Sequence, residues 1–405
     1  MIAIGAYMKY NNSMNKKIIL AMAAVLCAAS VTAGCNKSSG GGSDFYFQDM
    51  PKAEQISGDA VEVYGHVMGT DAILRVCDGG KFQGGAYDKA VKLWKDICDM
   101  LVSVNDSISV TVKSSYIAAF NGCAAGGRVE LNKTAYDVLS LAVAQYEVTG
   151  GYYNPAVYHS SVLYGFDPHG KNGLNKPDSL PSAEDTEAFR RLSAHFSEIG
   201  LEEKDGRYYA TKPAQTVTVG GVEYSLAIDL GGIGKGWCAD RAEELFASSG
   251  LSCGFFNFGS SSISFMSNLS DDGAFNVAAR DPRVNGKSYV RLKVKDESLS
   301  TSGDYEKYYE ADGARYCHVI DPTTGAPIQT GVASVTIVGG SAAENDALTT
   351  ALMAMGREKA EEYIAQKADG RKFIMLVFEE GKGYAVCNCP QDITLLNENY
   401  TVVAV

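Results

Sequence analysis

The chain has 405 residues, 46% of them hydrophobic, and a formal net charge of −12. This composition is typical of a folded globular protein and excludes a disordered chain or a disulfide-rich miniprotein. An acidic surface repels phosphate backbones, so nucleic acid is not expected as a partner. An anionic small ligand would need local neutralisation by a metal ion or a helix N-terminus.

The N-terminal segment has the pattern of a secretory signal. After Met14-Asn-Lys-Lys, an apolar run of about 14 residues extends from Ile18 to Val31, and small residues precede Cys35. The run is shorter than the roughly 20 residues of a membrane-spanning helix. The segment ending at Cys35 resembles a bacterial lipobox with Thr32 in place of the usual Leu, which implies cleavage before Cys35 and lipidation of its thiol. An ordinary signal with a chance cysteine is the alternative.

These features divide the chain into three parts. We expect residues 1–34 to form the signal peptide, with 1–13 an upstream extension or a misplaced start. Residues 35–58 contain a Gly/Ser-rich stretch that suits a flexible tether. Residues 59–405 are expected to form the folded part. The expected location is extracytoplasmic, anchored to the inner membrane.

The folded part shows helical and strand-like patterns in irregular alternation, without a strict βαβ repeat. Helical periodicity predicts helices over 87–101, 134–148, 182–194, 235–249, 342–355 and 358–368. Strand-like segments are 61–67, 72–77, 216–219, 274–279, 288–294, 332–338, 373–378 and 399–404. The pattern indicates an α+β fold in one continuous unit, organised in one lobe or two.

Eight cysteines remain beyond Cys35, and none forms a zinc-type Cys-x-x-Cys pair. Most stand beside apolar residues and are expected to act as small core side chains. For Cys387-Asn-Cys389 we favour the interpretation without redox activity. The spacing leaves any disulfide pairing open.

A glycine-rich segment, Asp229-Leu-Gly-Gly-Ile-Gly-Lys235-Gly-Trp, precedes a helical pattern. A Gly-rich turn entering a helix exposes unpaired N–H groups and lets the backbone approach a phosphate closely. Lys235 adds a positive charge, and Asp229 can accept a hydrogen bond from a ligand. The segment is neither a Walker A loop nor a GxGxxG motif. A tight strand-to-helix turn without a ligand is the alternative.

A second segment combines a helix start with two oxygen ligands. Ser341 and Glu344 have the spacing of a capping box, so a helix is expected to begin there. Asp346 and Thr350 are then four residues apart on one face of its first turns. A carboxylate and a hydroxyl suit Mg²⁺. Taken alone, the pattern fits an exposed Asp and a helical Thr without a metal better.

A third segment centres on His318, in an apolar stretch that leads into the turn Asp321-Pro-Thr-Thr-Gly325. His318 is a candidate for orienting a phosphate or moving a proton. A single histidine more often has a structural role. The sequence contains no Ser-His-Asp order, HExxH or paired-carboxylate motif that competes with these segments.

Taken in order, these segments resemble the ApbE family of flavin transferases (FAD:protein FMN transferases). That family reads M-G-T, F-D-x-T-V-G-P-L-x-x-L-W-G-F, L-D-L-G-G-I-A-K-G-Y, N-x-G-G-D, A-T-S-G-D-Y, H-I-I-D-P-x-T-G and D-A-L-x-T-A. The counterparts, in the same order, are residues 68–70, 153–166, 228–237, 257–261, 300–305, 318–325 and 346–351. The resemblance covers roughly residues 60 to 380, and the blocks are specific in combination.

The resemblance implies one T-fold-like α+β unit with largely antiparallel sheets. It also implies a Mg²⁺ ion held by the Asp346 carboxylate, the Thr350 hydroxyl and the main-chain carbonyl of Gly232. The residues that it assigns to the FAD site are Met68, Ala156, Val157, Tyr158, Asp229, Lys235 and Ile320.

The sequence departs from the family pattern at three places. Residues 156–159 read Ala-Val-Tyr-His where the family has Thr-Val-Gly-Pro, which puts side-chain contacts to FAD there in doubt. Thr111 aligns with the family's adenine-stacking Tyr, for which Tyr116 is a candidate substitute. Ser261 replaces the Asp of N-x-G-G-D. The three metal residues are intact.

The reaction implied by the resemblance is attack of a Thr or Ser hydroxyl of an acceptor protein on the FMN-side phosphorus of FAD, releasing AMP. Mg²⁺ at Asp346 and Thr350 would neutralise the diphosphate, and His318 or Asp321 would help deprotonate the hydroxyl. The expected acceptor is a flavoprotein subunit of a membrane or extracytoplasmic redox complex. Alternatives are an FAD pyrophosphatase that yields FMN and AMP, a non-catalytic FAD-binding lipoprotein, and a solute-binding lipoprotein.

Overall fold

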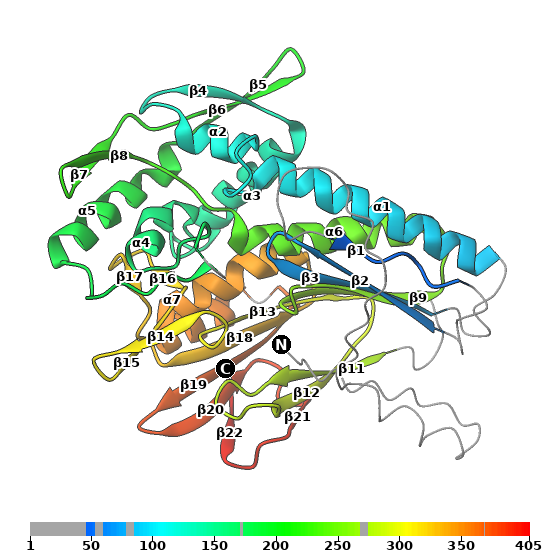
Figure 1. Ribbon diagram of the computed structural model, residues 1–405. Helices are drawn as coiled ribbons and strands as arrows, with labels where there is room; N and C mark the ends of the chain where they lie inside the picture. Colours follow the sequence, from blue (N-terminus) through cyan, green and yellow to red (C-terminus); the bar gives the residue numbers. More distant parts are fainter. Residues whose placement is uncertain (1–45, 53–59, 78–84, 171–172, 268–273, 368) are drawn as a thin grey trace.

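The computed structural model describes residues 46–52, 60–77, 85–170, 173–267, 274–367 and 369–405 (Figure 1). The predicted signal peptide, Cys35 and residues 36–45 of the predicted tether lie outside the described residues. Of the helices that the structure describes, none combines the length and the apolar character needed to cross a membrane.

A ten-stranded sheet forms the centre of the molecule. Its order is β1-β2-β3-β9-β10-β13-β18-β19-β20-β22, and neighbouring strands are antiparallel except for the parallel pair β20 and β22. The strands are β1 (Tyr46–Phe47), β2 (Ala60–Val67), β3 (Thr70–Cys77), β9 (Cys253–Phe258), β10 (Ser262–Ser267), β13 (Ser298–Gly303), β18 (Val332–Val338), β19 (Lys372–Glu379), β20 (Lys382–Cys387) and β22 (Tyr400–Ala404).

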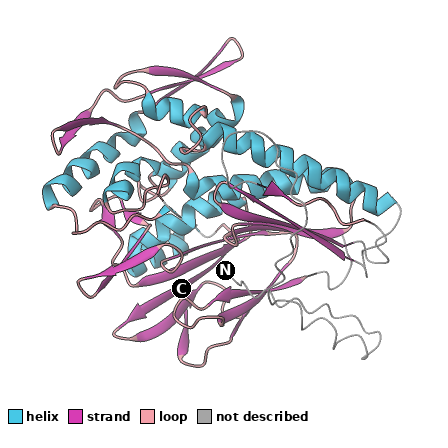
Figure 2. Cartoon of the chain, viewed as in Figure 1, coloured by secondary structure: helices cyan, strands magenta, loops and turns pink. Residues whose placement is uncertain are grey.

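Helices cover one face of this sheet (Figure 2). The helices α1, α6 and α7 lie along that face, and the others gather beyond their ends (Figure 1). The helices are α1 (Gly85–Ile108), α2 (Tyr116–Gly122), α3 (Lys133–Val148), α4 (Tyr158–Leu163), α5 (Ala183–Ser193), α6 (Gly231–Ser249) and α7 (Ala342–Lys367), with 3₁₀ turns η2 (Pro155–Val157) and η4 (Ala194–Glu198).

Among the described residues, five smaller sheets surround this body. One of them, β11-β12-β21, faces the side of the large sheet opposite the helices (Figure 1). The remaining strands are β4 (Arg128–Leu131), β5 (Gly200–Lys204), β6 (Arg207–Thr211), β7 (Thr216–Val219), β8 (Val222–Ser225), β11 (Phe275–Arg280), β12 (Ser288–Val294), β14 (Tyr308–Ala311), β15 (Ala314–Cys317), β16 (Ile320–Asp321), β17 (Ala326–Pro327) and β21 (Ile393–Leu395). The fold is thus α+β with mostly antiparallel sheets, as predicted.

The central strands are buried on both faces because a hydrophobic core lies on each side of the large sheet. On β9, Phe256 and Phe258 belong to the core under the helices, whereas Phe255 belongs to the core under β11 and β12. Successive strand residues point to opposite faces, so a strand covered on both sides shows no polar alternation. The sequence nevertheless predicted the buried strands β18 and β19. It did not predict β9 and β10, because Gly254, Asn257 and the three serines of β10 are residue types that favour turns.

The predicted helices are confirmed, with two refinements. The helix predicted over 235–249 begins earlier, at Gly231, so the glycine-rich segment forms its first turn. The two helices predicted over 342–355 and 358–368 are joined as α7, with non-helical backbone at Gly356 (φ 74°, ψ 177°). Thr301-Ser-Gly303, part of the 300–305 motif, ends strand β13.

The predicted boundary at residue 59 is too late, because part of the expected tether packs on the folded unit. Tyr46 and Phe47 pair with β2. The Phe47 ring meets Trp94 of α1 edge-on at 5.9 Å between centroids, and Trp94 Nε1 donates to the Gln48 carbonyl at 2.8 Å. An aromatic side chain and a backbone carbonyl therefore hold this segment in place.

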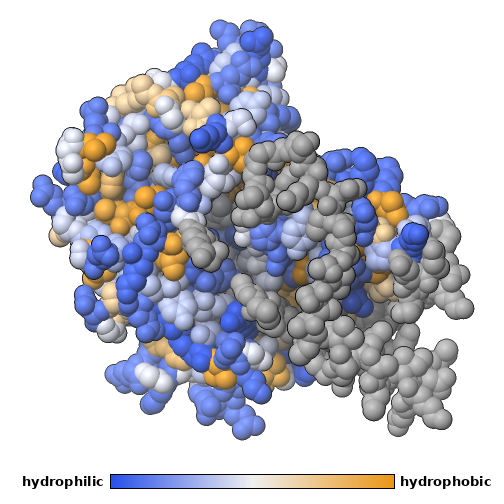
Figure 3. Space-filling view, in the orientation of Figure 1, coloured by the Kyte–Doolittle hydropathy of each residue, from blue (hydrophilic) through white to orange (hydrophobic). Residues whose placement is uncertain are grey.

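The cysteines largely behave as small core side chains. Cys238, Cys317, Cys387 and Cys389 are buried without a disulfide. Cys77 and Cys253, opposite each other on the neighbouring strands β3 and β9, form a disulfide. On the face seen in Figure 3, hydrophilic residues predominate and apolar residues lie in small groups, as expected of an acidic globular chain.

Candidate functional site

The N-terminus of α6 is positioned by side chains from distant parts of the sequence. The side chain of Asn121 in α2 forms two hydrogen bonds with the backbone of Ile228. It donates to the Ile228 carbonyl at 2.8 Å and accepts from the Ile228 amide at 2.9 Å. Asp229 Oδ1 then accepts from the Gly231 amide at 2.8 Å. Burial raises the pKa of Asp229, while the Gly231 amide and the charges of Lys307 and Lys235 oppose that rise.

The N-terminus of α7 is attached to α6 through one carboxylate. Asp240 accepts hydrogen bonds from the Ser341 hydroxyl at 2.6 Å and from the amides of Ala342 and Ala343 at 2.7 and 3.1 Å. These amides belong to the first turn of α7, and the N–H groups of a first turn have no carbonyl acceptor within the helix. Asp240 thus fixes the position of α7 relative to α6.

Glycine allows the two helices to cross at close range. A Cβ atom at Gly236 would lie 2.1 Å from the Ala342 carbonyl oxygen, so no other residue fits there without moving α7. The crossing brings the buried Asp346 against α6. Asp346 Oδ2 accepts from the Gly236 amide at 3.1 Å and lies 3.8 Å from Lys235 Nζ.

Thr350 lies on the same side of α7 as Asp346, as the spacing predicted. Its hydroxyl donates to the Asp346 carbonyl at 3.3 Å and lies 3.4 Å from the Ser302 hydroxyl of β13. The same Thr350 oxygen is 3.9 Å from the point where a Cβ of Gly232 would be. We call the group of Gly232, Lys235, Asp346 and Thr350 the α6–α7 site.

The donor atoms of the α6–α7 site fit a magnesium ion. Asp346 supplies a carboxylate, Thr350 a hydroxyl and Gly232 a main-chain carbonyl, all of them oxygen acceptors. Within the described residues, no group of three or more His, Cys, Asp or Glu side chains is arranged to hold a metal. A sparse set of hard oxygen ligands is what Mg²⁺ uses when substrate phosphates complete its shell.

The turn at Met68 also reaches the start of α6. Met68 and Gly69 both have positive φ, 55° and 69°, and connect β2 to β3 in a two-residue hairpin. The Met68 Cε atom is 3.7 Å from the Cβ position of Gly234. The turn at Gly259 lies beside Lys235. The Lys235 Cδ atom is 3.1 Å from the point where a Cβ of Gly259 would be.

The segment 156–158 lies next to Asp229. The Asp229 amide donates to the Pro155 carbonyl at 3.0 Å, at the start of the turn that carries Ala156 and Val157. Burial raises the pKa of the Tyr158 phenol, and the charge of Asp229 contributes to the rise. His159, one of the departures from the family pattern, stacks on Phe189 at 5.1 Å and its Nε2 lies 2.9 Å from the Ser225 carbonyl oxygen.

His318 lies between β15 and β16, with its amide bonded to the Lys307 carbonyl at 3.0 Å. Its Nδ1 atom is buried and has no partner among the described residues. Burial, followed by the charges of Lys307 and Lys235, lowers the pKa of His318 to about 4, so the ring is neutral at pH 7. Ile320 is buried on β16.

Asp321 and Ser261 have local partners. Asp321 Oδ1 accepts from the amide and the hydroxyl of Thr323 at 2.8 and 2.7 Å, as in an Asx turn, so Asp321 is the weaker candidate for a base. The Ser261 carbonyl accepts from the Thr301 amide at 2.7 Å, whereas the Ser261 hydroxyl is buried without a partner in the described chain.

The predicted adenine contact finds no further support in the structure. Thr111 is exposed in the loop before α2, with its hydroxyl 3.0 Å from that of Ser109. Tyr116 begins α2 and is exposed. Neither side chain makes a described contact with the α6–α7 site.

Sequence reasoning did not single out three residues at this site. Tyr153 and Ser302 lie inside quoted motifs but carried no predicted role, and they border Gly232 and Thr350 respectively. Lys307 follows the 300–305 block, and its charge acts on both Asp229 and His318. Only a search for basic residues flanking each motif could have found Lys307.

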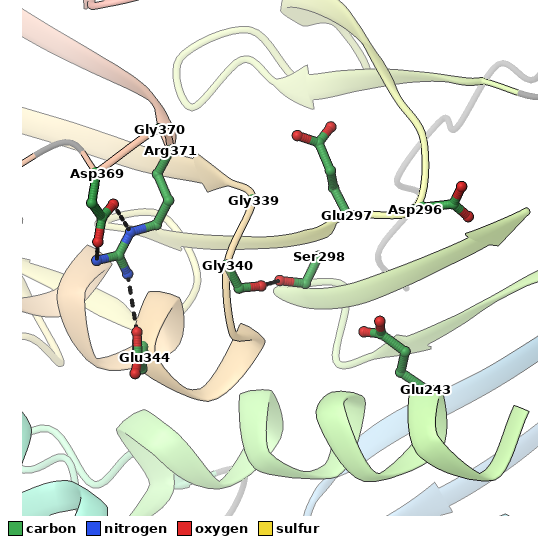
Figure 4. Close-up of a pocket in the computed structure, with 10 residues that line it drawn as sticks. All are labelled: Glu243, Asp296, Glu297, Ser298, Gly339, Gly340, Glu344, Asp369, Gly370 and Arg371. Carbon is green, nitrogen blue, oxygen red and sulfur yellow. Dashed lines mark hydrogen bonds and ion pairs between the residues drawn. The ribbon is translucent and has the colours of Figure 1, made fainter. Parts of the chain in front are cut away.

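A pocket of about 300 Å³ opens elsewhere, beside the first turn of α7 (Figure 4). Carboxylates dominate its lining, and Arg371 is engaged by Asp369 and Glu344. Such a lining repels a diphosphate. We call it the acidic pocket, and none of its lining residues is a predicted site residue. The lining consists of Glu243, Asp296, Glu297, Ser298, Gly339, Gly340, Glu344, Asp369, Gly370 and Arg371.

Sequence comparison relates the chain to known proteins. The profile of the ApbE family matches residues 68–375. An FAD:protein FMN transferase of Vibrio cholerae is 30% identical over 303 residues, covering 74% of this chain and 83% of that protein. One from Treponema pallidum is 31% identical over 263 residues, covering 62% and 68%.

Solved structures agree with the sequence matches. The flavin transferase ApbE from Vibrio cholerae superimposes with a TM-score of 0.65 at 27% identity, covering 81% of this chain and 97% of that one. The ApbE protein from Thermotoga maritima gives a TM-score of 0.64 at 26% identity, covering 78% and 94%.

Proposed function

The chain belongs to the ApbE family, and from this premise and the geometry of the α6–α7 site we propose that it is an FAD:protein FMN transferase. In the proposed reaction, the hydroxyl of a Thr or Ser on an acceptor protein attacks the FMN-side phosphorus of FAD. A new P–O bond forms, the P–O bond of the diphosphate bridge breaks, and AMP leaves.

The main observation behind the proposal is that Asp346 and Lys235 lie close together at the first turn of α6. The start of a helix carries a positive partial charge that favours an anion. Lys235 lies at this start with its Nζ 3.1 Å from the Gly231 carbonyl. In a chain of net charge −12, this local positive field is what a diphosphate requires.

The metal residues of the proposal are Asp346, Thr350 and the carbonyl of Gly232. When bound there, Mg²⁺ supplies charge neutralisation to the diphosphate oxygens. Asp346 is held for this role by the Gly236 amide, and Thr350 by its bonds to the Asp346 carbonyl and Ser302. Phosphoryl transfer depends mainly on such positioning and electrostatic stabilisation.

His318 is proposed as the group that accepts the proton of the attacking hydroxyl. Its neutral ring has a nitrogen without a partner in the described part of the chain. Burial and two nearby lysines keep the ring neutral above about pH 4, and a neutral imidazole has one nitrogen that can accept a proton. A positioned base of this kind contributes about 10²- to 10⁴-fold to a rate.

We further propose that the enzyme works outside the cytoplasm, anchored through lipidated Cys35 to the inner membrane. The Cys77–Cys253 disulfide supports this location, because disulfides persist in oxidising compartments. From there it would reach an acceptor flavoprotein subunit of a membrane or extracytoplasmic redox complex. Palmitate labelling of the wild type and of Cys35→Ala tests the anchor; equal labelling would reject it.

The activity is tested by incubating the protein with FAD, Mg²⁺ and a candidate redox subunit. The expected result is flavin fluorescence that stays with the acceptor in a denaturing gel, together with an equal amount of AMP. Mass spectrometry should place FMN on a Thr or Ser. Release of AMP and free FMN without a labelled acceptor would instead identify an FAD pyrophosphatase.

A further inference from the structure

Tyr153 carries a buried hydroxyl that nothing in the described chain satisfies. The residue is 3% exposed, and its hydroxyl oxygen has no hydrogen-bond partner among the described residues. Most buried polar groups in folded proteins are paired, so an unpaired one at a site needs an explanation. The backbone around it is well held, since the Tyr153 amide donates to the Thr149 hydroxyl at 3.0 Å.

The phenol lies against the α6–α7 site. Its Cε2 atom is 3.4 Å from the point where a Cβ of Gly232 would stand, and the Thr350 hydroxyl oxygen is 3.9 Å from the same point. A Cβ atom at position 232 would therefore be in van der Waals contact with both side chains. The ring thus borders the place where the diphosphate is proposed to bind.

The Tyr153 phenol is protonated at neutral pH, because a tyrosine hydroxyl ordinarily has a pKa of about 10. The carboxylates whose charges act on it are those of Asp346 and Asp229. Neither carboxylate accepts a hydrogen bond from it in the structure. A protonated phenol without a partner is a donor ready for an acceptor that arrives with a ligand.

We propose that the Tyr153 hydroxyl donates a hydrogen bond to a diphosphate oxygen of bound FAD. The inference rests on the proposed function, because it takes the dinucleotide as the ligand. A buried donor without a partner lowers the stability of the free protein. A charged acceptor on the ligand satisfies the donor, so binding recovers the lost free energy. Tyr153 thereby contributes to binding the substrate while leaving metal binding to Asp346, Thr350 and Gly232.

The test is Tyr153→Phe, which removes the hydroxyl and keeps the ring. The matched control is Tyr152→Phe, since the hydroxyl of Tyr152 already has a partner in Lys359. Three measurements are made without acceptor protein: the melting temperature of the free protein, the Kd for FAD in the presence of Mg²⁺, and Mg²⁺ binding in the absence of FAD.

For Tyr153→Phe we expect an unchanged or higher melting temperature, an FAD Kd raised about tenfold or more, and unchanged Mg²⁺ binding. Tyr152→Phe should leave the FAD Kd unchanged. An FAD Kd equal to that of the wild type would overturn the inference. So would weaker Mg²⁺ binding without FAD, or a lower melting temperature than that of Tyr152→Phe.

The outcomes separate this inference from the proposed function. If the wild type binds FAD but transfers no FMN, and Tyr153→Phe still weakens FAD binding, the transferase proposal fails and the inference stands. If the wild type transfers FMN and Tyr153→Phe binds FAD normally, only the inference fails. A wild type that does not bind FAD rejects both.

Discussion

Two polar regions flank the first turns of α7, and they differ in how their groups are paired. In the α6–α7 site, the buried Asp346 faces Lys235 and a backbone amide, and the nearby Tyr153 and His318 keep unpaired polar atoms. In the acidic pocket, carboxylates outnumber cations and Arg371 is already engaged (Figure 4).

This contrast shows that an open pocket does not by itself mark the site for an anionic substrate. The acidic pocket offers volume but a repulsive field, whereas the α6–α7 site offers the positive end of a helix dipole, a lysine and the unpaired hydroxyl of Tyr153. Unpaired buried groups cost free energy in the free protein, and a ligand that satisfies them recovers this cost. The chemistry is therefore expected at the α6–α7 site.

The largest effect should come from Asp346→Asn, which keeps an acceptor for the Gly236 amide and removes the charge. We expect FMN transfer to fall by about 10³-fold or more, since losing one group that stabilises transition-state charge costs about 3–4 kcal/mol. The control is Glu344→Gln, two residues earlier on α7, which should remain active. Removing Mg²⁺ with EDTA should abolish wild-type transfer. A folded Asp346→Asn that transfers FMN at the wild-type rate rejects the metal assignment.

The next effect should come from Asp240→Ala, which removes the carboxylate that joins α7 to α6. Loss of its three hydrogen bonds should lower the free energy of unfolding by about 2–3 kcal/mol. Denaturant unfolding measures it, and Asp240→Asn should lose less. Because the helices would no longer be held together, the Mg²⁺ concentration for half-maximal activity should also rise. An unchanged unfolding midpoint would contradict this role.

A smaller effect should come from the pH dependence of stability at His318. Its pKa of about 4 in the folded protein lies below the ordinary value of 6.5, so the unfolded chain binds the proton first. Stability is therefore lost as the pH falls from about 6.5 to about 4. In protein free of FAD and Mg²⁺, His318→Gln should remove most of that loss, because glutamine does not titrate. The free energy of unfolding is measured against pH for the wild type and for His318→Gln. The same pH dependence in both proteins would contradict a buried neutral His318.

The smallest effect should come from the acidic pocket. Burial, then the charges of Asp240 and Asp296, raises the pKa of Glu243. Glu243→Gln removes one of these mutually repelling charges, so we expect stability within about 0.5 kcal/mol of the wild type and unchanged kinetics for FAD. Steady-state assays at several FAD concentrations measure this. A markedly higher KM for FAD would indicate that FAD binds at the acidic pocket, which would contradict the difference drawn between the two regions.

Much of the helical architecture was predictable, because amphipathic periods and glycine stops are local signals. The stop at Gly356 and the four-residue spacing of Asp346 and Thr350 are examples. The strands β9 and β10 were missed because Gly254, Asn257 and the serines of β10 are residue types that favour turns. The Cys77–Cys253 pair was left open because it joins residues 176 positions apart.

The sequence by itself determined the longer helices, the motif order and the family, but not the short helices α2 and α4. The tertiary structure alone decided that Asp346 meets the Gly236 amide across 110 residues, that Asp240 binds the first turn of α7, and that Tyr153 is left without a partner. The physical reason is that these relations depend on the crossing of two helices. That crossing is set by a whole packed core and not by any local pattern.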